Sequence, residues 1–218
     1  MKGCEQTKGL SVLDHGESVK TYLFDLLNHL RDGAPLQKNW RLPDWLAENR
    51  EFILSELPDD STLELYTVYH DIGKPHCLSI DESGKRHFPN HAEISYQVFN
   101  QVFDNPLAAD LIRHDMDVHL LKADGVEAFC KSPNVVTLLI TGLSEIHSNA
   151  DMFGGIESTS FKIKWKCLNQ RGKQIFSIIN KKPQFKMKTQ EQKNKEAMTY
   201  LEKTSKHIFL NGKETIGQ

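Results

Sequence analysis

The chain has 218 residues, of which 39% are hydrophobic and 26% charged, a composition typical of a soluble globular protein with one sizeable core. No apolar run reaches the roughly 20 residues that cross a bilayer, the first residues lack an apolar secretory signal, and four scattered cysteines favour reduced thiols and a cytoplasmic location. The net charge of −2 divides into −12 for residues 1–159 (13 Lys and Arg, 25 Asp and Glu) and +10 for residues 160–218 (14 and 4), which predicts an acidic body with a basic extension.

The first part of the chain predicts helices that bring polar residues to their ends and faces. An apolar stripe of helical period begins at the capping residue Ser11, and His15 lies on this stripe. Further helices are expected over residues 43–57 and from residue 60 or 61 to the pair His70-Asp71. The turn sequence at residues 81–84 separates two short extended runs and predicts a small hairpin.

Three more helices are expected in the middle of the chain. Asn90 and Glu93 resemble a capping box, which places His91 in the first turn of the following helix. Residues 105–106 open the next helix, which ends near His114. Residues 132–133 cap a long apolar helix that carries Asp151 at its end.

The sequence changes character after residue 158. Residues 161–167 alternate apolar and cationic side chains, which predicts a half-buried strand, and Thr189 with Gln192 predicts the cap of a final helix. We therefore expect an all-α helical bundle over residues 1–158, followed by a small basic α+β extension over residues 159–218.

The adjacent pair His70-Asp71 is the most informative feature. Neighbouring side chains on a helix point about 100° apart, but both can converge where the helix ends, and Gly73 and Pro75 mark such an end. A neutral imidazole beside a carboxylate suits a divalent metal ion that activates water. Read alone, the pair is equally an ordinary capped helix end.

Other potential ligands lie on apolar faces or at helix ends, each on a separate helix. A helical bundle can bring such residues to one point. One octahedral ion could be held by four of them: His15, His70, Asp71 and Asp151. A second ion could be held by His91 and His114, with Asp71 bridging the pair.

This set of motifs resembles the HD-domain superfamily of metal-dependent phosphohydrolases. His15 matches the histidine of the first helix, His70-Asp71 the name-giving pair, and Asp151 the late aspartate. The sequence HDIGKP at residues 70–75, with FPNH at 88–91 and LIRHDM at 111–116, is closest to the HD domain of bacterial tRNA nucleotidyltransferases. The likeness covers about residues 11–155 and implies the HD-domain bundle and one or two divalent ions, Mn²⁺, Mg²⁺, Ni²⁺, Co²⁺ or Fe²⁺.

Several subgroup signatures are missing. The chain has no nucleotidyltransferase head with paired carboxylates after Gly-Ser, so nucleotide addition is not expected. It also lacks the Glu-Asp pair of alarmone hydrolases, the Gly-Tyr-Pro motif of cyclic-dinucleotide enzymes and the Gly-His continuation of the deoxynucleotide triphosphohydrolases. Asp115 stands where the family often has a second histidine, so it is either an oxygen ligand or a sign that only one ion binds.

The resemblance implies hydrolysis of a phosphoester on a nucleotide or an RNA end. Water activated by metal and Asp71 would attack phosphorus, and Lys74 would neutralise a phosphoryl oxygen. The rest of the substrate would be held by three residues near the pair: Lys85, His87 and Arg113. His119 and His147 are candidates for protonating a leaving group, although nothing in the sequence singles them out.

Each assignment has a plainer alternative. His15 alone reads as a buried helix histidine, and Lys74 as a cation that favours a helix dipole. Aromatic residues interleave with lysines after residue 160, which fits contact with single-stranded nucleic acid or a small core.

The rival functions are a nucleotide-pool phosphohydrolase and a catalytically silent nucleic-acid-binding module. No membrane partner is expected, and the sequence leaves the oligomeric state open.

Overall fold

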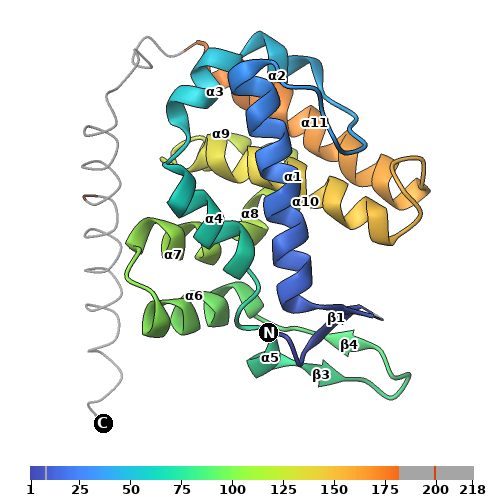
Figure 1. Cartoon of the computed structure of the whole chain (residues 1–218). Helices are drawn as coiled ribbons and strands as arrows, with labels where there is room; N and C mark the ends of the chain where they lie inside the picture. The colour runs from blue at the N-terminus through green and yellow to red at the C-terminus, as the bar shows by residue number, and fades with distance from the viewer. Residues whose placement is uncertain (8, 182–198, 200–218) are drawn as a thin grey trace.

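The computed structural model describes residues 1–7, 9–181 and 199, and it is mainly helical (Figure 1). Helices occupy the following ranges: α1 Val12–Asp32, α2 Asp44–Glu48, α3 Arg50–Glu56, α4 Asp60–Tyr69, α5 Lys74–Cys77, α6 His91–Val102, α7 Pro106–Arg113, α8 Asp115–Leu120, α9 Val126–Phe129, α10 Val135–Met152 and α11 Thr159–Ile179, with a 3₁₀ turn η1 at Ala123–Gly125. Two antiparallel hairpins complete it, β1 (Glu5–Thr7) with β2 (Leu10–Ser11) and β3 (Ser79–Ile80) with β4 (Arg86–His87). The expectation of an all-α body and of a hairpin around residues 81–84 is confirmed.

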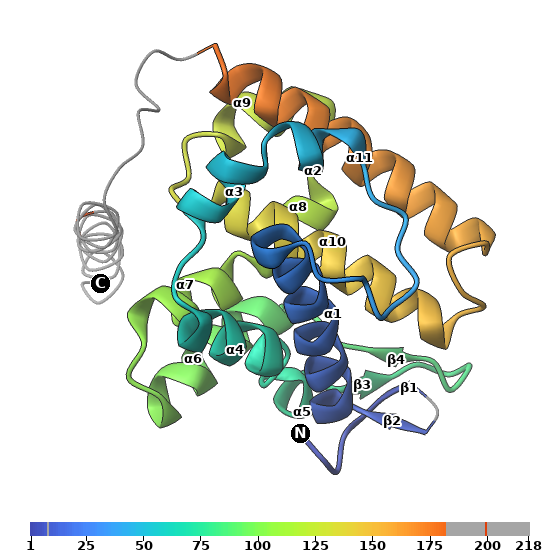
Figure 2. The same cartoon turned by 45° about the horizontal axis from the view of Figure 1, so that its top comes forward.

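The central helix α1 begins where its sequence predicts. The Ser11 hydroxyl accepts a hydrogen bond from the backbone N–H of Asp14, and the Asp14 carboxylate accepts one from the backbone of Ser11. The apolar stripe of α1 is buried between α4 and α10 (Figures 1 and 2). The start of α1 therefore lies where three helices meet.

Two helical segments differ from the sequence prediction, one at its start and one by a break in its middle. Asn90 caps no N–H group with its side chain, because its backbone takes the left-handed conformation (φ 54°), and Glu93 instead accepts hydrogen bonds from Gln97 and Arg113. The expected capping box is therefore wrong. The expected helix over residues 43–57 is broken at Asn49 into α2 and α3.

The predicted strand at residues 161–167 is also wrong, because these residues form the first two turns of α11. Its cap is Ser158, whose hydroxyl accepts a hydrogen bond from the backbone N–H of Phe161. One face of α11 is part of the common core through these residues: Phe161, Leu168, Ile175, Phe176 and Ile179. The expected boundary between residues 158 and 159 thus precedes a helix that packs on the body. The final helix expected from Thr189 lies outside the described residues.

The two hairpins lie side by side at the end of the bundle where α1 begins, next to α5 (Figures 1 and 2). All four cysteines are free thiols. Within the described part of the chain, every helix is too short or too polar to traverse a bilayer.

Candidate metal centre

The pair His70-Asp71 follows directly after α4 in a tight turn. The backbone N–H of Lys74 donates to the carbonyl of Asp71 over 3.0 Å, which closes this turn. Both residues of the pair are about 2% exposed. The Nε2 atom of His70 lies 3.2 Å from Oδ2 of Asp71, so the turn brings the neighbouring imidazole and carboxylate together.

Two imidazole rings are fixed by backbone carbonyls that leave Nε2 directed at Asp71. His70 Nδ1 donates to the carbonyl of Thr67 over 2.8 Å, and His91 Nδ1 donates to that of Phe88 over 3.0 Å. His91 Nε2 then lies 3.7 Å from Asp71 Oδ1. A histidine that donates through Nδ1 presents a lone pair on Nε2, which is the usual arrangement of a metal ligand.

His15 reaches the same point because α1 passes very close to α4. A Cβ atom on the adjacent Gly16 would lie 2.1 Å from the carbonyl oxygen of Val68, so only glycine permits this approach. His15 is completely buried, and its ring centroid lies 5.1 Å from that of His70. Its Nε2 atom lies 3.8 Å from Oδ2 of Asp71.

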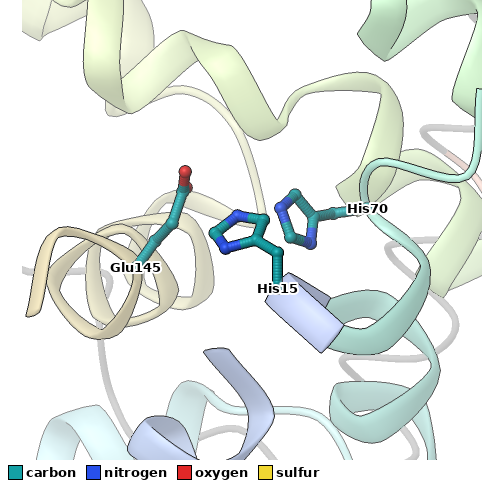
Figure 3. Close-up of side chains that lie close together, drawn as sticks. All are labelled: His15, His70 and Glu145. Atoms are coloured by element: carbon teal, nitrogen blue, oxygen red, sulfur yellow. The ribbon is translucent and has the colours of Figure 1, made fainter. Parts of the chain in front are cut away.

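The third element is α10, which supplies Glu145. One ligand atom each from His15, His70 and Glu145 lies within 4.8 Å of the others, and the three side chains point toward one another (Figure 3). None of the sequence motifs includes Glu145. A signal was present, because Glu145 is the single Asp, Glu, Lys or Arg between residues 135 and 150.

Asp151 does not join this group. Its Oδ2 accepts a 2.6 Å hydrogen bond from the hydroxyl of Tyr22, which is seven residues after His15 and therefore about 10 Å farther along α1. The carboxylate that α10 directs at the two histidines is Glu145, almost two turns earlier.

His114 has other partners as well. Its Nδ1 lies 2.8 Å from Oδ2 of Asp117, and its Nε2 lies 3.7 Å from Oδ1 of Asp110. The structure thus brings together four of the six expected ligands, adds Glu145, and places His114 and Asp151 in separate interactions.

Lys74 is held beside the pair. Its ammonium lies 2.5 Å from Oδ2 of Asp71 and 2.9 Å from Oε1 of Gln6, and it sits over the ring of Phe88 at 5.3 Å from the centroid. The side chain is 9% exposed. The structure therefore places a buried cation directly beside Asp71.

The other expected substrate residues make contacts of their own. Arg113 donates to Glu93 over 2.8 Å and stacks over the Tyr96 ring. His87 pairs with Asp81 at 2.7 Å inside the second hairpin, and Lys85 is exposed at its turn. Asp115 accepts a 2.6 Å hydrogen bond from the buried Tyr66 hydroxyl.

Burial and charge act against each other at the centre. Burial lowers the pKa of His15 to about 4, and the neighbouring His70 adds to this effect. Burial also opposes a charge on His70, but the Asp71 carboxylate outweighs it and raises the pKa of His70 to about 10. Burial would raise the pKa of Asp71, yet His70 and Lys74 hold it well below its usual range. With this pKa, His70 carries a second ring proton at neutral pH. A divalent cation bound at the ring nitrogen can replace this proton as the positive charge beside Asp71.

Glu145 is oriented from its other side by His119. The His119 Nε2 atom lies 2.7 Å from Oε2 of Glu145. Burial opposes ionisation of Glu145, but the charge of His119 keeps the pKa of this carboxyl below its usual range. Glu145 is therefore an anion inside the bundle.

Three nitrogen atoms at the centre are buried without a well-formed hydrogen bond among the described residues: Nδ1 and Nε2 of His15, and Nε2 of His70, whose 3.2 Å contact with Asp71 lacks hydrogen-bond geometry. Buried polar atoms are nearly always paired, so each such atom calls for an explanation. Imidazole nitrogens and carboxylate oxygens are ligands for Zn²⁺, Fe²⁺, Co²⁺, Ni²⁺ and Mn²⁺. The residues present fit a divalent transition-metal ion.

Comparisons with protein-family models, curated proteins and solved structures find no match for this chain.

Proposed function

We propose that the protein is a metal-dependent phosphohydrolase of the HD-domain type, with a divalent ion held by His15, His70 and Glu145 beside Asp71. The observation that carries this proposal is the pair of buried imidazoles with unpartnered nitrogens facing a carboxylate. A structural cluster would satisfy these atoms by hydrogen bonds, because an unpaired buried polar atom costs about 1–3 kcal/mol.

The residues divide the chemistry among them. A bound divalent cation supplies Lewis acidity toward water and toward a phosphoryl oxygen. Asp71 would orient the attacking water as a hydrogen-bond acceptor, because its carboxylate is ionised and faces both His70 and His91. Lys74 neutralises charge that develops on a phosphoryl oxygen, since its ammonium is fixed next to Asp71.

We infer a phosphoester on a nucleotide or an RNA end as the substrate class. The support is the Lys74 ammonium beside Asp71 and the positive charge of α11, where residues 159–179 hold five Lys or Arg and no Asp or Glu. A phosphate-rich substrate is attracted by such a surface. A truncated chain can distinguish a free nucleotide from an RNA end as the substrate. The deletion should start at residue 182, because α11 belongs to the core.

The experiment measures metal content and hydrolysis in the same preparations. Full-length protein loaded with Mn²⁺, Ni²⁺, Co²⁺ or Fe²⁺ should bind one or two equivalents by elemental analysis and cleave bis-p-nitrophenyl phosphate. His15→Leu and Glu145→Leu should lose the metal and the activity. His76→Ala is the matched control, because His76 is exposed on α5, close to the centre.

Two results would contradict the proposal. One is a wild-type protein that retains no divalent metal under any of these conditions. The other is metal-loaded protein that is inactive on nucleotides, cyclic nucleotides, RNA ends and the chromogenic diester alike.

A second candidate is a silent nucleic-acid-binding module, favoured by one observation. Lys162, Lys166 and Lys173 are exposed on the side of α11 opposite its buried face. Stacking by Phe161 and Phe176 is not available, since both rings lie in the core. Binding to single-stranded RNA that weakens steeply with salt, and that survives Glu145→Leu, would favour this function.

A further inference from the structure

The N-terminal hairpin contributes a side chain to the candidate centre. Gln6 in β1 accepts a hydrogen bond from the Lys74 ammonium over 2.9 Å, across 68 residues of sequence. The hairpin of β1 and β2 lies beside α5, the helix that begins with Lys74 (Figure 1). Nothing in the sequence pattern pointed to Gln6.

A second contact fixes the hairpin in this place. Arg86 in β4 donates to the Glu5 carboxylate over 2.5 Å, and its other terminal nitrogen reaches the Glu5 carbonyl at 3.4 Å. Glu5 is next to Gln6, so this ion pair joins the two hairpins directly beside the residue that holds Lys74. The two hairpins lie side by side in both views (Figures 1 and 2).

We propose that Gln6 is the positioning residue for Lys74, and this inference rests on the proposed phosphohydrolase function. An ammonium group has three donors, and the contacts with Asp71 and Gln6 occupy two of them. Among the described residues this leaves one donor for a phosphoryl oxygen. Gln6 is uncharged, so it fixes the direction of the ammonium without neutralising the charge that the reaction needs.

Without Gln6, the Lys74 side chain keeps one anchor and gains rotational freedom around it. Gln6→Leu removes the acceptor at nearly constant volume, whereas Gln6→Glu keeps an acceptor oxygen. Gln174→Leu is the matched control, because Gln174 is exposed on α11, in contact with Arg171 and away from the hairpins. Gln6→Ala serves if the leucine variant is not folded by circular dichroism.

The first measurement does not depend on activity. Full-length protein is treated with an amine-acetylating reagent, and the rate of Lys74 modification is followed by mass spectrometry. In Gln6→Leu this rate should rise about tenfold or more, the factor expected for one hydrogen bond to a charged group, while Gln6→Glu and Gln174→Leu stay near the wild-type rate. Equal rates in wild type and Gln6→Leu, or equally fast reaction in Gln6→Glu and Gln6→Leu, would overturn the assignment.

The second measurement tests whether the contact between Gln6 and Lys74 affects the rate of hydrolysis. With Mn²⁺ and bis-p-nitrophenyl phosphate, Gln6→Leu should lower kcat about tenfold and leave KM within a factor of about two, while Gln174→Leu keeps both values of the wild type. An unchanged kcat in Gln6→Leu overturns the positioning role. An inactive wild-type protein overturns the proposed function instead, and the acetylation rates then still decide whether Gln6 holds Lys74.

Discussion

His119 holds one oxygen of Glu145 at 2.7 Å and so determines where the carboxylate points inside the bundle. Partners behind a metal ligand commonly change metal affinity by 10- to 100-fold when they are removed. Glu145 and His119 lie on α10 and α8, so this hydrogen bond also links two helices.

We expect His119→Leu to weaken Mn²⁺ binding by about 10- to 100-fold, because Glu145 loses the group that orients it. His119→Gln retains a donor and should lose less. Isothermal titration with Mn²⁺ measures the dissociation constants, and His76→Ala controls for loss of an exposed imidazole. Unchanged affinity in the leucine variant would show that Glu145 is not a ligand.

A second residue-scale prediction concerns the start of α4, the helix that ends at His70-Asp71. The Asp59 carboxylate accepts hydrogen bonds from the backbone N–H of Thr62 and from the hydroxyls of Ser61 and Thr62. Asp59→Ala should lower the free energy of unfolding by about 1 kcal/mol at pH 7, as measured by urea titration, whereas Asp59→Asn retains the cap.

The pH dependence of this cap has a definite sign. Burial would raise the pKa of Asp59, but the hydrogen bonds from Ser61 and Thr62 lower it below its usual value. The stabilisation by the charged form is therefore present above the unfolded pKa near 4 and is lost as the pH falls through the folded pKa. The difference between wild type and Asp59→Asn should shrink in the same range, and a difference that grows on acidification would contradict this.

At the scale of elements, the approach of α1 to α4 decides whether His15 can meet His70. Gly16 is the contact point, with the backbone of Val68 where its Cβ would be. The backbone cannot give way as a side chain can, so any larger residue must separate the two helices. The candidate metal centre therefore depends on Gly16, a residue that has no side chain to bind a metal ion.

Gly16→Ala should therefore lower the free energy of unfolding by about 1–3 kcal/mol, the usual cost of overpacking, and should also weaken Mn²⁺ binding. Gly125→Ala is the control, because its nearest new neighbour would be a side-chain atom of Leu121 at 3.4 Å. Chemical denaturation and titration with Mn²⁺ measure the two effects. Normal Mn²⁺ affinity in Gly16→Ala would mean that His15 is not needed as a ligand.

The elements also show what the sequence could predict. The helix from Ser11, the hairpin around residues 81–84 and the convergence of His70 with Asp71 follow from local signals such as caps, turn residues and a helix end. The alternation at residues 161–167 fitted a strand over seven residues, but apolar residues recur at helical spacing from Phe161 to Ile179. A longer window would have indicated a helix.

The choice between Asp151 and Glu145 could not be made from the sequence. Both lie on the same helix, and which of them faces His15 depends on the rotation of α10 against α1. Packing sets this rotation, and nothing local records it. The contact of Gln6 with Lys74 belongs to the same class, because a side chain in a short hairpin meets its partner only after the chain has folded.

At the scale of the whole molecule, the core extends through α11. Gly172 lies against Trp45, where a Cβ would be 2.4 Å from the indole ring, and Phe176 stacks near the same ring. The basic character of residues 159–181 is therefore restricted to the outer face of a core helix. The charge difference between the two parts of the chain does not mark the edge of the core.

We expect a chain ending at residue 181 to keep a cooperative thermal transition, because the named core residues end at Ile179. A chain ending at residue 158 should lose it, since it would expose Trp45 and the other apolar partners of α11. Circular dichroism and calorimetry of both truncations measure the effect. A cooperative transition in the shorter chain would contradict the assignment of α11 to the core.

The candidate ligands come from positions 15, 70 and 145, so an ion bound there would connect segments that are 130 residues apart in the chain. Such an ion acts as a removable cross-link: it binds only the folded arrangement and stabilises it by mass action, by about 2.7 kcal/mol at a free concentration 100 times the dissociation constant. Stripping the metal with a chelator should lower the midpoint of thermal unfolding in wild type and leave it unchanged in Glu145→Leu. The same three side chains would then determine both the proposed hydrolysis and the temperature at which the protein unfolds.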